Sequence, residues 1–407
     1  MFDIVKEQQL NFLPISGIRL GSTAAGIKYA DRNDLVVMEI APGSSCAAVF
    51  TRNAFCAAPV QVAKEHIAST TPQYLLINSG NANAGTGSDG MDVCNQTCAA
   101  LAEVAGCDAS QVLPFSTGVI GELLPLEKVT AALPQAVNNL HESGWSDAAK
   151  AIMTTDAVPK LVSRSIEISG TAISITGMAK GSGMIRPDMA TMLAYVATDA
   201  KVDADLLQTC LQQAVEPSFN SITVDGDTST NDACVLVATG AGGQPEITDP
   251  GSEAFALLCS EVKAVCMELA RAIVKDGEGA TKLVEVLVQG AVDSAEARQV
   301  AYTIAHSPLV KTALYASDPN WGRILAAVGR AGLENLDINA IRIWLGDVSI
   351  VKDGGKDPAY TEQAGQAVMD QDEIVIRVEL GRGDVGATVL TCDLSYDYVK
   401  INAEYRT

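Results

Sequence analysis

The sequence lacks the features that direct a protein to membranes or nucleic acids. No stretch of its 407 residues approaches the roughly 18 uninterrupted apolar residues that a membrane-spanning helix needs. Basic residues are scarce, since 28 Lys and Arg stand against 49 Asp and Glu, and the formal net charge is -21. A surface of this charge repels phosphate backbones and anionic lipids. We therefore expect neither a nucleic acid nor a membrane as a partner.

Metal-ligand spacing and a signal for secretion are also missing. The 10 cysteines form no CxxC pair, and the 3 histidines lie far apart along the chain. The segment VDGDTSTND at 224–232 resembles a calcium loop, but it lacks the glycine at position six and the glutamate at position twelve. The N-terminal MFDIVKEQQLNF has charges where a signal peptide is apolar. We expect a cytoplasmic protein with reduced, buried thiols and no metal.

Apolar residues, by contrast, make up 48% of the chain, and 34 residues are glycine. A chain of this length can bury a large core, as two or three domains or as one layered α/β unit. Apolar periodicity predicts strands within 34–51 around a Pro-Gly turn and at 74–78, 192–200 and 282–290, hairpins at 161–180 and 373–394, and helices at 93–106, 127–143, 251–275, 294–316 and 321–331.

Helices and strands are thus mixed along the whole chain, and several neighbouring strands are joined by tight turns. This order predicts an α/β fold of the α+β type, with stacked α and β layers and mixed or antiparallel sheets. It disfavours a doubly wound nucleotide-binding fold, in which parallel strands alternate regularly with helices.

The run KGSGMIRPDMATM at 180–192 carries the most specific chemical signal. Its glycines and Pro187 indicate a long turn, after which Thr191 opens an apolar strand. A threonine hydroxyl is a weak nucleophile unless a base lies beside it, and the α-amino group of an N-terminal threonine is such a base. An internal threonine gains that amine if its hydroxyl attacks the preceding carbonyl and water then cleaves the ester. The bond between Ala190 and Thr191 is therefore a candidate for self-cleavage, with a plain turn as the alternative.

Two further segments offer groups that such a nucleophile needs. In PFSTGVIGE, at 114–122, Gly118 allows a close approach of the backbone and the Thr117 hydroxyl can donate to an oxyanion. In VKDGEGATK, at 274–282, Glu278 lies between two glycines and can receive a substrate ammonium. Each segment has an ordinary explanation as well, a loop or helix cap for the first and a helix end with its turn for the second.

Several segments, taken in order, resemble those of the glutamate N-acetyltransferase/ornithine acetyltransferase family of arginine biosynthesis. They are NSGNANAGTG, STGVIGE, MTTD, KGSGMIRPDMATML with the TDA that follows it, SFNSITVDGDTSTND, KDGEGATK, SDPNWGRI and YVKINAEYRT. The resemblance covers nearly the whole chain. Many matches in one order are far more specific than any single one. The chain departs from the family at Arg186 and Asp188, where Ala and Asn are frequent, and at Gly85, where a cysteine is common.

The resemblance implies an acyltransferase with a self-processing, N-terminal-threonine nucleophile architecture. The precursor would cleave itself into an α chain, residues 1–190, and a β chain, residues 191–407, which stay together in an α2β2 tetramer. Thr191 would take the acetyl group of N2-acetyl-L-ornithine and release L-ornithine, and L-glutamate would then accept the acetyl group in a ping-pong cycle. No cofactor is implied, although some members also use acetyl-CoA as a donor.

The resemblance also assigns the residues of the site. Thr117 and Gly118 match the oxyanion-hole pair of the family, and the residues that match its substrate contacts are Thr154, Lys180, Thr191, Glu278, Asn402 and Thr407. Charge matching pairs Lys180 with the carboxylate of an amino acid and Glu278 with an ammonium.

Two other functions are compatible with parts of the sequence. An amidohydrolase or aminopeptidase of the same architecture would use the same nucleophile and pass the acyl group to water. A non-enzymatic scaffold would keep its 42.4 kDa chain intact, with the glycine-rich loops as plain turns.

Overall fold

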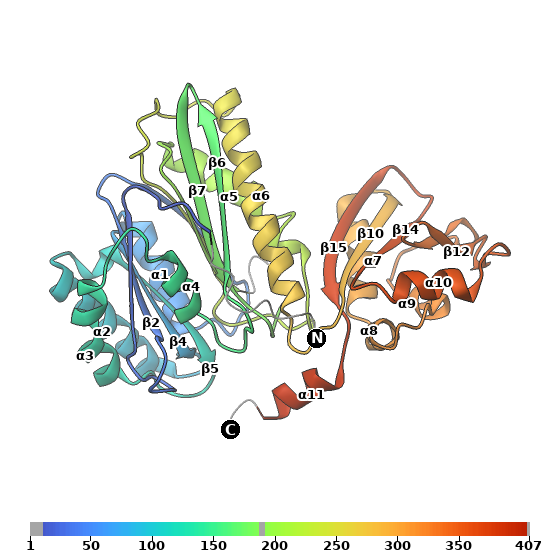
Figure 1. The fold of residues 1–407 in the computed structure, drawn as a ribbon, viewed down its shortest axis with the longest axis horizontal. Coiled ribbons are helices and arrows are strands. Elements are labelled where there is room, and N and C mark those ends of the chain that lie inside the picture. Colours follow the sequence, from blue (N-terminus) through green and yellow to red (C-terminus); the bar gives the residue numbers. More distant parts are fainter. Residues whose placement is uncertain (1–10, 187–191, 405–407) are drawn as a thin grey trace. The chain divides into compact units, whose positions relative to one another are not determined.

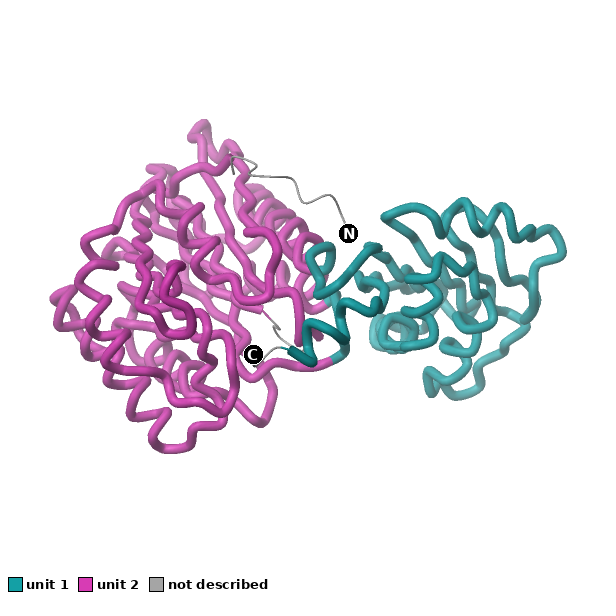
Figure 2. The backbone as a smooth tube through the Cα atoms, turned by 60° about the horizontal axis from the view of Figure 1, so that its bottom comes forward, with its two compact units in different colours: residues 1–5, 221–226, 274–407 teal, residues 6–220, 227–273 magenta. Residues whose placement is uncertain are grey.

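The chain forms two compact units, which are described separately. The computed structural model describes residues 11–186 and 192–404. Within these residues, the sandwich unit comprises 11–220 and 227–273, and the C-terminal unit comprises 221–226 and 274–404 (Figure 2). The expected boundary between α and β chains, after residue 190, therefore falls inside the sandwich unit.

The sandwich unit contains two mixed sheets. The four-stranded sheet has the order β1 (Ile18–Thr23), β2 (Leu35–Ile40), β4 (Tyr74–Asn81) and β5 (Val112–Val119). The five-stranded sheet has the order β3 (Ser45–Phe50), β9 (Ala233–Ala238), β8 (Leu193–Thr198), β7 (Thr171–Lys180) and β6 (Lys160–Ile168). The pairs β4–β5 and β8–β9 are parallel and the others antiparallel. The predicted α/β fold with mixed sheets is confirmed.

Helices cover both outer faces of this pair of sheets. Helices α1 (Ala58–Ser69), α2 (Gly87–Ala105) and α3 (Leu126–Asn138) pack on one face of the four-stranded sheet (Figure 1). Its other face packs, with α4 (Trp145–Ala151), against the five-stranded sheet. Helices α5 (Ala204–Val215) and α6 (Glu253–Lys275) lie on the outer face of the five-stranded sheet. Because both faces of the five-stranded sheet are covered, every residue of β8 and β9 is buried, which explains their continuous apolar sequences.

The strands predicted in this unit are present, and their pairing follows two patterns. The hairpin at 161–180 is confirmed, since β6 pairs with β7 around Ser169 and Gly170, which have φ angles of 52° and 78°. The two strands predicted within 34–51 are also confirmed, but they do not pair with each other. β2 belongs to the four-stranded sheet and β3 to the five-stranded one, so the Pro-Gly turn connects the two layers.

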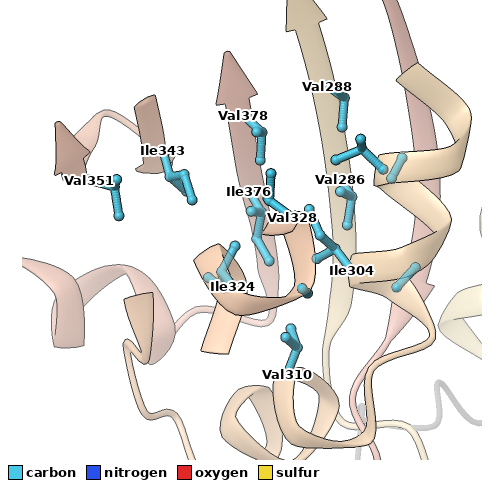
Figure 3. Packing of buried hydrophobic residues seen from close by; sticks show 14 of the residues in the cluster. Val286, Val288, Ile304, Val310, Ile324, Val328, Ile343, Val351, Ile376 and Val378 are labelled. Atoms are coloured by element: carbon cyan, nitrogen blue, oxygen red, sulfur yellow. The ribbon is translucent and has the colours of Figure 1, made fainter. Parts of the chain in front are cut away.

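The C-terminal unit is one six-stranded sheet with helices. Its strands have the order β13 (Gly355–Lys356), β12 (Val348–Lys352), β11 (Arg342–Leu345), β14 (Glu373–Glu379), β10 (Leu283–Ala291) and β15 (Val385–Cys392). Its helices are α7 (Ser294–Ala305), α8 (Pro308–Tyr315), α9 (Trp321–Gly329), α10 (Glu362–Met369) and α11 (Tyr396–Ala403). The core lies between β10, β11 and β14 and helices α7 to α9, as Figure 3 shows for Val286, Ile304 and Ile376. No helix among the described residues combines the length and the apolar character needed to cross a membrane.

Two predictions in this unit were wrong. The single helix expected at 294–316 is divided, because Ser307 caps a new helix whose first residue is Pro308, and proline cannot continue a helix. The hairpin expected at 373–394 does not form, because β10 lies between β14 and β15, parallel to the first and antiparallel to the second. The turn after β14 instead passes the end of β10, where the amides of Arg382 and Gly383 donate to the Gly290 carbonyl.

The core of the C-terminal unit can be tested at Ile376, which is fully buried in the central strand β14. Ile376→Ala leaves a cavity and should lower the free energy of unfolding by about 2–5 kcal/mol. Val375→Ala is the matched control, because Val375 lies on the same strand and is 37% exposed, and its effect should stay within about 0.5 kcal/mol. Guanidinium unfolding of both variants measures the difference; equal effects would contradict the assignment of the two faces.

Candidate active site

Thr117 and Gly118 lie near the end of β5, where this strand comes unusually close to β4. Gly118 has a φ angle of 137°, and a Cβ atom there would lie 2.2 Å from the carbonyl carbon of Gly80, its register partner. Only glycine fits this position. The predicted close approach of the backbone is thus present, and its partner is the neighbouring strand.

Lys180, the last residue of β7, extends toward this strand end. It is 8% exposed, and its Nζ atom donates to Oγ1 of Thr117 over 3.2 Å. β7 belongs to the five-stranded sheet and β5 to the four-stranded one, so two of the predicted residues meet between the sheets. A hydroxyl and an ammonium brought together in a buried place can stabilise a negatively charged oxygen or bind a carboxylate.

Asp156 connects Thr154 to the same place. Its carboxylate accepts hydrogen bonds from the backbone amides of Thr154, at 3.0 Å, and Gly181, at 2.7 Å, and from Nζ of Lys160, at 2.7 Å. Burial by itself raises the pKa of Asp156, but the ammonium groups of Lys160 and Lys180 and these hydrogen bonds outweigh burial and hold it well below its usual range. The side chains of Asp156 and Lys160 are 0% and 1% exposed. The ionised Asp156 therefore holds two backbone segments beside the candidate site, at Thr154 and at Gly181.

Asn231 holds strand β5 from a third side. It is 6% exposed, and its Nδ2 atom donates to the carbonyl oxygens of Ala82, at 2.6 Å, and Ser116, at 3.0 Å. The Ser116 carbonyl belongs to the peptide that precedes Thr117. The segment that resembled a calcium loop therefore orients this peptide through an amide.

Glu278 and Asn402 lie together in the C-terminal unit. Nδ2 of Asn402, on α11, donates to Oε2 of Glu278 over 2.7 Å, and Glu278 is 8% exposed. The loop that carries Glu278 is tied to the start of α11, because the Ser395 hydroxyl donates to the Gly279 carbonyl over 2.6 Å. The structure thus places the predicted residues in two groups, one in each unit.

Three predicted residues, Ala190, Thr191 and Thr407, lie outside the described residues. Thr191 is covalently bonded to Met192, which directly precedes β8. Leu193, the first residue of β8, is the register partner of Lys180.

The sequence alone predicted no role for Asp156 or Asn231. Asp156 was present in the MTTD motif, four residues before Lys160, and Asn231 was the last residue but one of the motif SFNSITVDGDTSTND. Their bonding partners lie far away in sequence, so no local pattern identifies them. No cluster of three or more His, Cys, Asp or Glu that could hold a metal ion occurs in 11–186 or 192–404.

Comparison with known proteins identifies similar chains. Residues 19–407 match the model of the ArgJ family. A curated relative from Methylococcus capsulatus, named arginine biosynthesis bifunctional protein ArgJ, is 59% identical over 398 residues, 98% of this chain and 97% of the relative. A relative of the same name from Pseudomonas fluorescens is 57% identical over 394 residues, 97% of each chain. A crystal structure of the Bacillus halodurans protein of that name is 41% identical and covers 51% of this chain and 96% of that chain, with a TM-score of 0.48.

The role of Asp156 can be tested by neutralising it. Asp156→Asn removes the carboxylate that lies 2.7 Å from the buried Lys160 ammonium, which should destabilise the fold by about 3–5 kcal/mol in denaturant unfolding at neutral pH. Asp156→Asn combined with Lys160→Met removes both charges and should regain part of this loss. If the single variant were as stable as the native protein, the ion pair would not hold the site together.

Proposed function

The chain belongs to the ArgJ family, and we propose that it acts as an acetyltransferase of arginine biosynthesis, passing the acetyl group of N2-acetyl-L-ornithine to L-glutamate. The products are L-ornithine and N-acetyl-L-glutamate. The observation that carries this proposal is the contact of Lys180 with Thr117, in a chain that matches the family from residue 19 to its end. Both substrates are amino acids, and a buried lysine beside a hydroxyl suits their carboxylates.

The reaction begins with self-cleavage between Ala190 and Thr191. The freed α-amino group, with a reference pKa of about 7.7–8.0, takes the proton of the Thr191 hydroxyl while the oxygen attacks the acetyl carbon. The Thr117 hydroxyl and the Gly118 amide stabilise the oxyanion that forms. The carbon–nitrogen bond of the donor then breaks, ornithine leaves with the proton, and the acetyl group remains as an ester on Thr191. The amino group of glutamate attacks this ester and restores the enzyme.

The sheet supports the proposal that cleavage leaves both chains in place. β7 and β8 pair along Ile175–Lys180 and Leu193–Thr198, one strand on each side of the bond to be broken. These hydrogen bonds do not depend on the covalent link between residues 190 and 191, so we expect the two chains to stay associated, as an α2β2 tetramer.

We assign the remaining residues to substrate binding. Glu278, oriented by Asn402, offers a carboxylate to a substrate ammonium, and Thr154 and Thr407 complete the set. We expect the enzyme to act in the cytoplasm, in keeping with cysteines that are all free thiols in the structure.

Self-cleavage has a direct test. The purified protein should give two fragments by intact mass, the second beginning TMLAYVATDA. Thr191→Ala removes the hydroxyl and should leave one uncleaved chain without detectable transfer. Thr191→Ser keeps a hydroxyl and serves as the matched control, which should still cleave. An acetyl-enzyme formed by Thr191→Ala would show that another residue is the nucleophile. Acetate release without glutamate, at the rate of transfer, would favour the amidohydrolase.

We further propose that acetyl-CoA serves as a second acetyl donor. The support is that the curated relatives carry the word bifunctional in their name. Purified enzyme given L-glutamate and acetyl-CoA, without acetylornithine, should form N-acetyl-L-glutamate and free thiol in equal amounts, and Thr191→Ala should form neither. If the enzyme transfers the acetyl group from acetylornithine but not from acetyl-CoA, it is monofunctional.

A further inference from the structure

Asp393 lies in the C-terminal unit, at the point where strand β15 ends beside the start of β10. The last residue of β15, Cys392, is the register partner of Leu283, the first residue of β10. The segment that precedes β10 and the segment that follows β15 therefore lie side by side. Asp393 is 3% exposed, so its carboxylate has to find its hydrogen-bond donors within the protein.

The carboxylate of Asp393 accepts three hydrogen bonds from the segment before β10. Its Oδ1 atom accepts from the backbone amides of Thr281, at 2.8 Å, and Lys282, at 2.9 Å, and its Oδ2 atom accepts from the Thr281 hydroxyl, at 2.7 Å. Hydrogen bonds to a carboxylate are stronger than those between neutral groups, and two of these bonds hold the backbone itself. Asp393 therefore fixes the chain three residues after Glu278.

The segment that carries Asp393 is itself anchored to helix α8. Lys311 of α8 is 4% exposed, and its Nζ atom donates to the carbonyl oxygen of Cys392 and, over 3.2 Å, to Oγ1 of Thr391. The backbone amide of Leu394 donates to the Lys311 carbonyl over 3.2 Å. Because the residues on both sides of Asp393 are held in this way, its carboxylate is a fixed support for the segment opposite.

Glu278 needs such a support, because its own segment has little stiffness. It lies between Gly277 and Gly279, and glycine restricts the backbone less than any other residue. Gly279 has a φ angle of 68°, and a Cβ atom there would lie 2.6 Å from the hydroxyl oxygen of Ser395, so a stiffer residue does not fit. The position of Glu278 is therefore set by bonds to other segments.

Two of these bonds lead to helix α11. The Ser395 hydroxyl donates to the Gly279 carbonyl over 2.6 Å, and Nδ2 of Asn402 donates to Oε2 of Glu278 over 2.7 Å. Seven residues separate Ser395 from Asn402, about two helical turns, so both lie on the same side of α11. The helix and the Glu278 segment thus form one closed set of bonds, which is attached to the sheet where β15 ends.

We propose that Asp393 is a positioning residue for Glu278, which it holds in place through the backbone of Thr281 and Lys282 so that the Glu278 carboxylate receives the side-chain ammonium of the acetyl donor. This inference rests on the proposed function, which assigns Glu278 to a substrate ammonium. In N2-acetyl-L-ornithine the α-nitrogen is an amide, so the ammonium is the one at the end of the side chain. Asp393 acts through Glu278 and exchanges no bond with the substrate.

The test measures kcat and KM of the cleaved enzyme for N2-acetyl-L-ornithine at saturating L-glutamate. Asp393→Ala removes all three hydrogen bonds and should raise KM about 10-fold with little change in kcat, because a displaced Glu278 weakens the ground state and the transition state alike. Asp393→Asn keeps an oxygen for the two backbone amides, and its NH2 group can donate to the Thr281 hydroxyl. Its KM should therefore stay near the native value.

Two comparisons show whether the effect passes through Glu278. In a Glu278→Gln background, which itself raises KM, Asp393→Ala should raise KM no further, since substitutions that remove one shared interaction do not add. N-acetyl-L-norvaline has the side chain of the donor without its ammonium, and its kcat/KM should be equal for native and Asp393→Ala enzyme. Additive effects in the first comparison, or an equal loss for both donors in the second, would overturn the inference.

Asp357→Ala is the matched control for a loss of stability. Asp357 is 8% exposed and accepts hydrogen bonds from the Ser349 hydroxyl, at 2.5 Å, and from the Ala359 amide, at 2.8 Å. It follows β13, at the edge of the six-stranded sheet opposite β15. Asp357→Ala should lower the denaturant concentration at the unfolding midpoint and leave KM for acetylornithine unchanged. A rise in KM equal to that of Asp393→Ala would show that any weakening of this unit has the same effect, and would contradict the inference.

A milder substitution keeps the inference testable if Asp393→Ala does not fold. Thr281→Val removes only the hydroxyl that donates to Oδ2 of Asp393 and should raise KM about 3-fold, whereas Thr281→Ser keeps a hydroxyl and should keep the native KM. A native KM in Thr281→Val would count against Asp393. Failure of the proposed function differs from all these outcomes, because the native protein itself would then transfer no acetyl group.

Discussion

The hydrogen bonds of one buried carboxylate, that of Asp156, hold together the segments on which the candidate site depends. They join the backbone at Thr154, the start of β6 at Lys160 and Gly181, the residue that follows β7. Asp156 thus ties its own local segment to the far end of the β6–β7 hairpin at Gly181, and no apolar contact could fix these backbones with the same directionality. The ionised state is maintained by the two lysines, so the geometry of the site is set by electrostatics inside an otherwise apolar sandwich.

Lys180 interacts electrostatically with two carboxyl groups whose pKa values are shifted in opposite directions. Asp156 has three hydrogen-bond donors, and its pKa is lowered, whereas the Oδ2 atom of Asp232 has none in the described residues and burial raises its pKa. Both groups are buried, so the difference follows from their surroundings: the charges of Lys160 and Lys180 and the hydrogen bonds outweigh burial at Asp156, whereas Ser229 and Lys180 do not outweigh it at Asp232. Groups of one chemical type that are driven to different protonation states occur where proton transfer is needed, which agrees with the proposed chemistry.

Sequence periodicity identified the strands and helices better than it identified their neighbours. Ile374, Ile376 and Val378 alternate with outward residues in the same way whether β14 pairs with β15 or with β10, so the pattern gives the buried face but not the partner. The same holds for β2 and β3, which enter different sheets. In the site, Thr117 was a candidate from its own segment and Lys180 was assigned through resemblance, whereas Asn231 was missed, because its partner Ser116 lies 115 residues away. Bonds over such separations leave no local signal.

The order of strands in the five-stranded sheet has a consequence for how the enzyme can be encoded. β8 and β9 follow the proposed cleavage bond, and they lie between β3 and β7, which precede it. A β chain synthesised by itself would carry two fully buried, largely apolar strands that pair with each other but lack their outer neighbours β7 and β3, a state prone to aggregation. Synthesis as one polypeptide keeps the flanking strands tethered nearby while the sheet assembles. A gene divided at codon 191 would lose this advantage, so the single reading frame serves folding as well as catalysis.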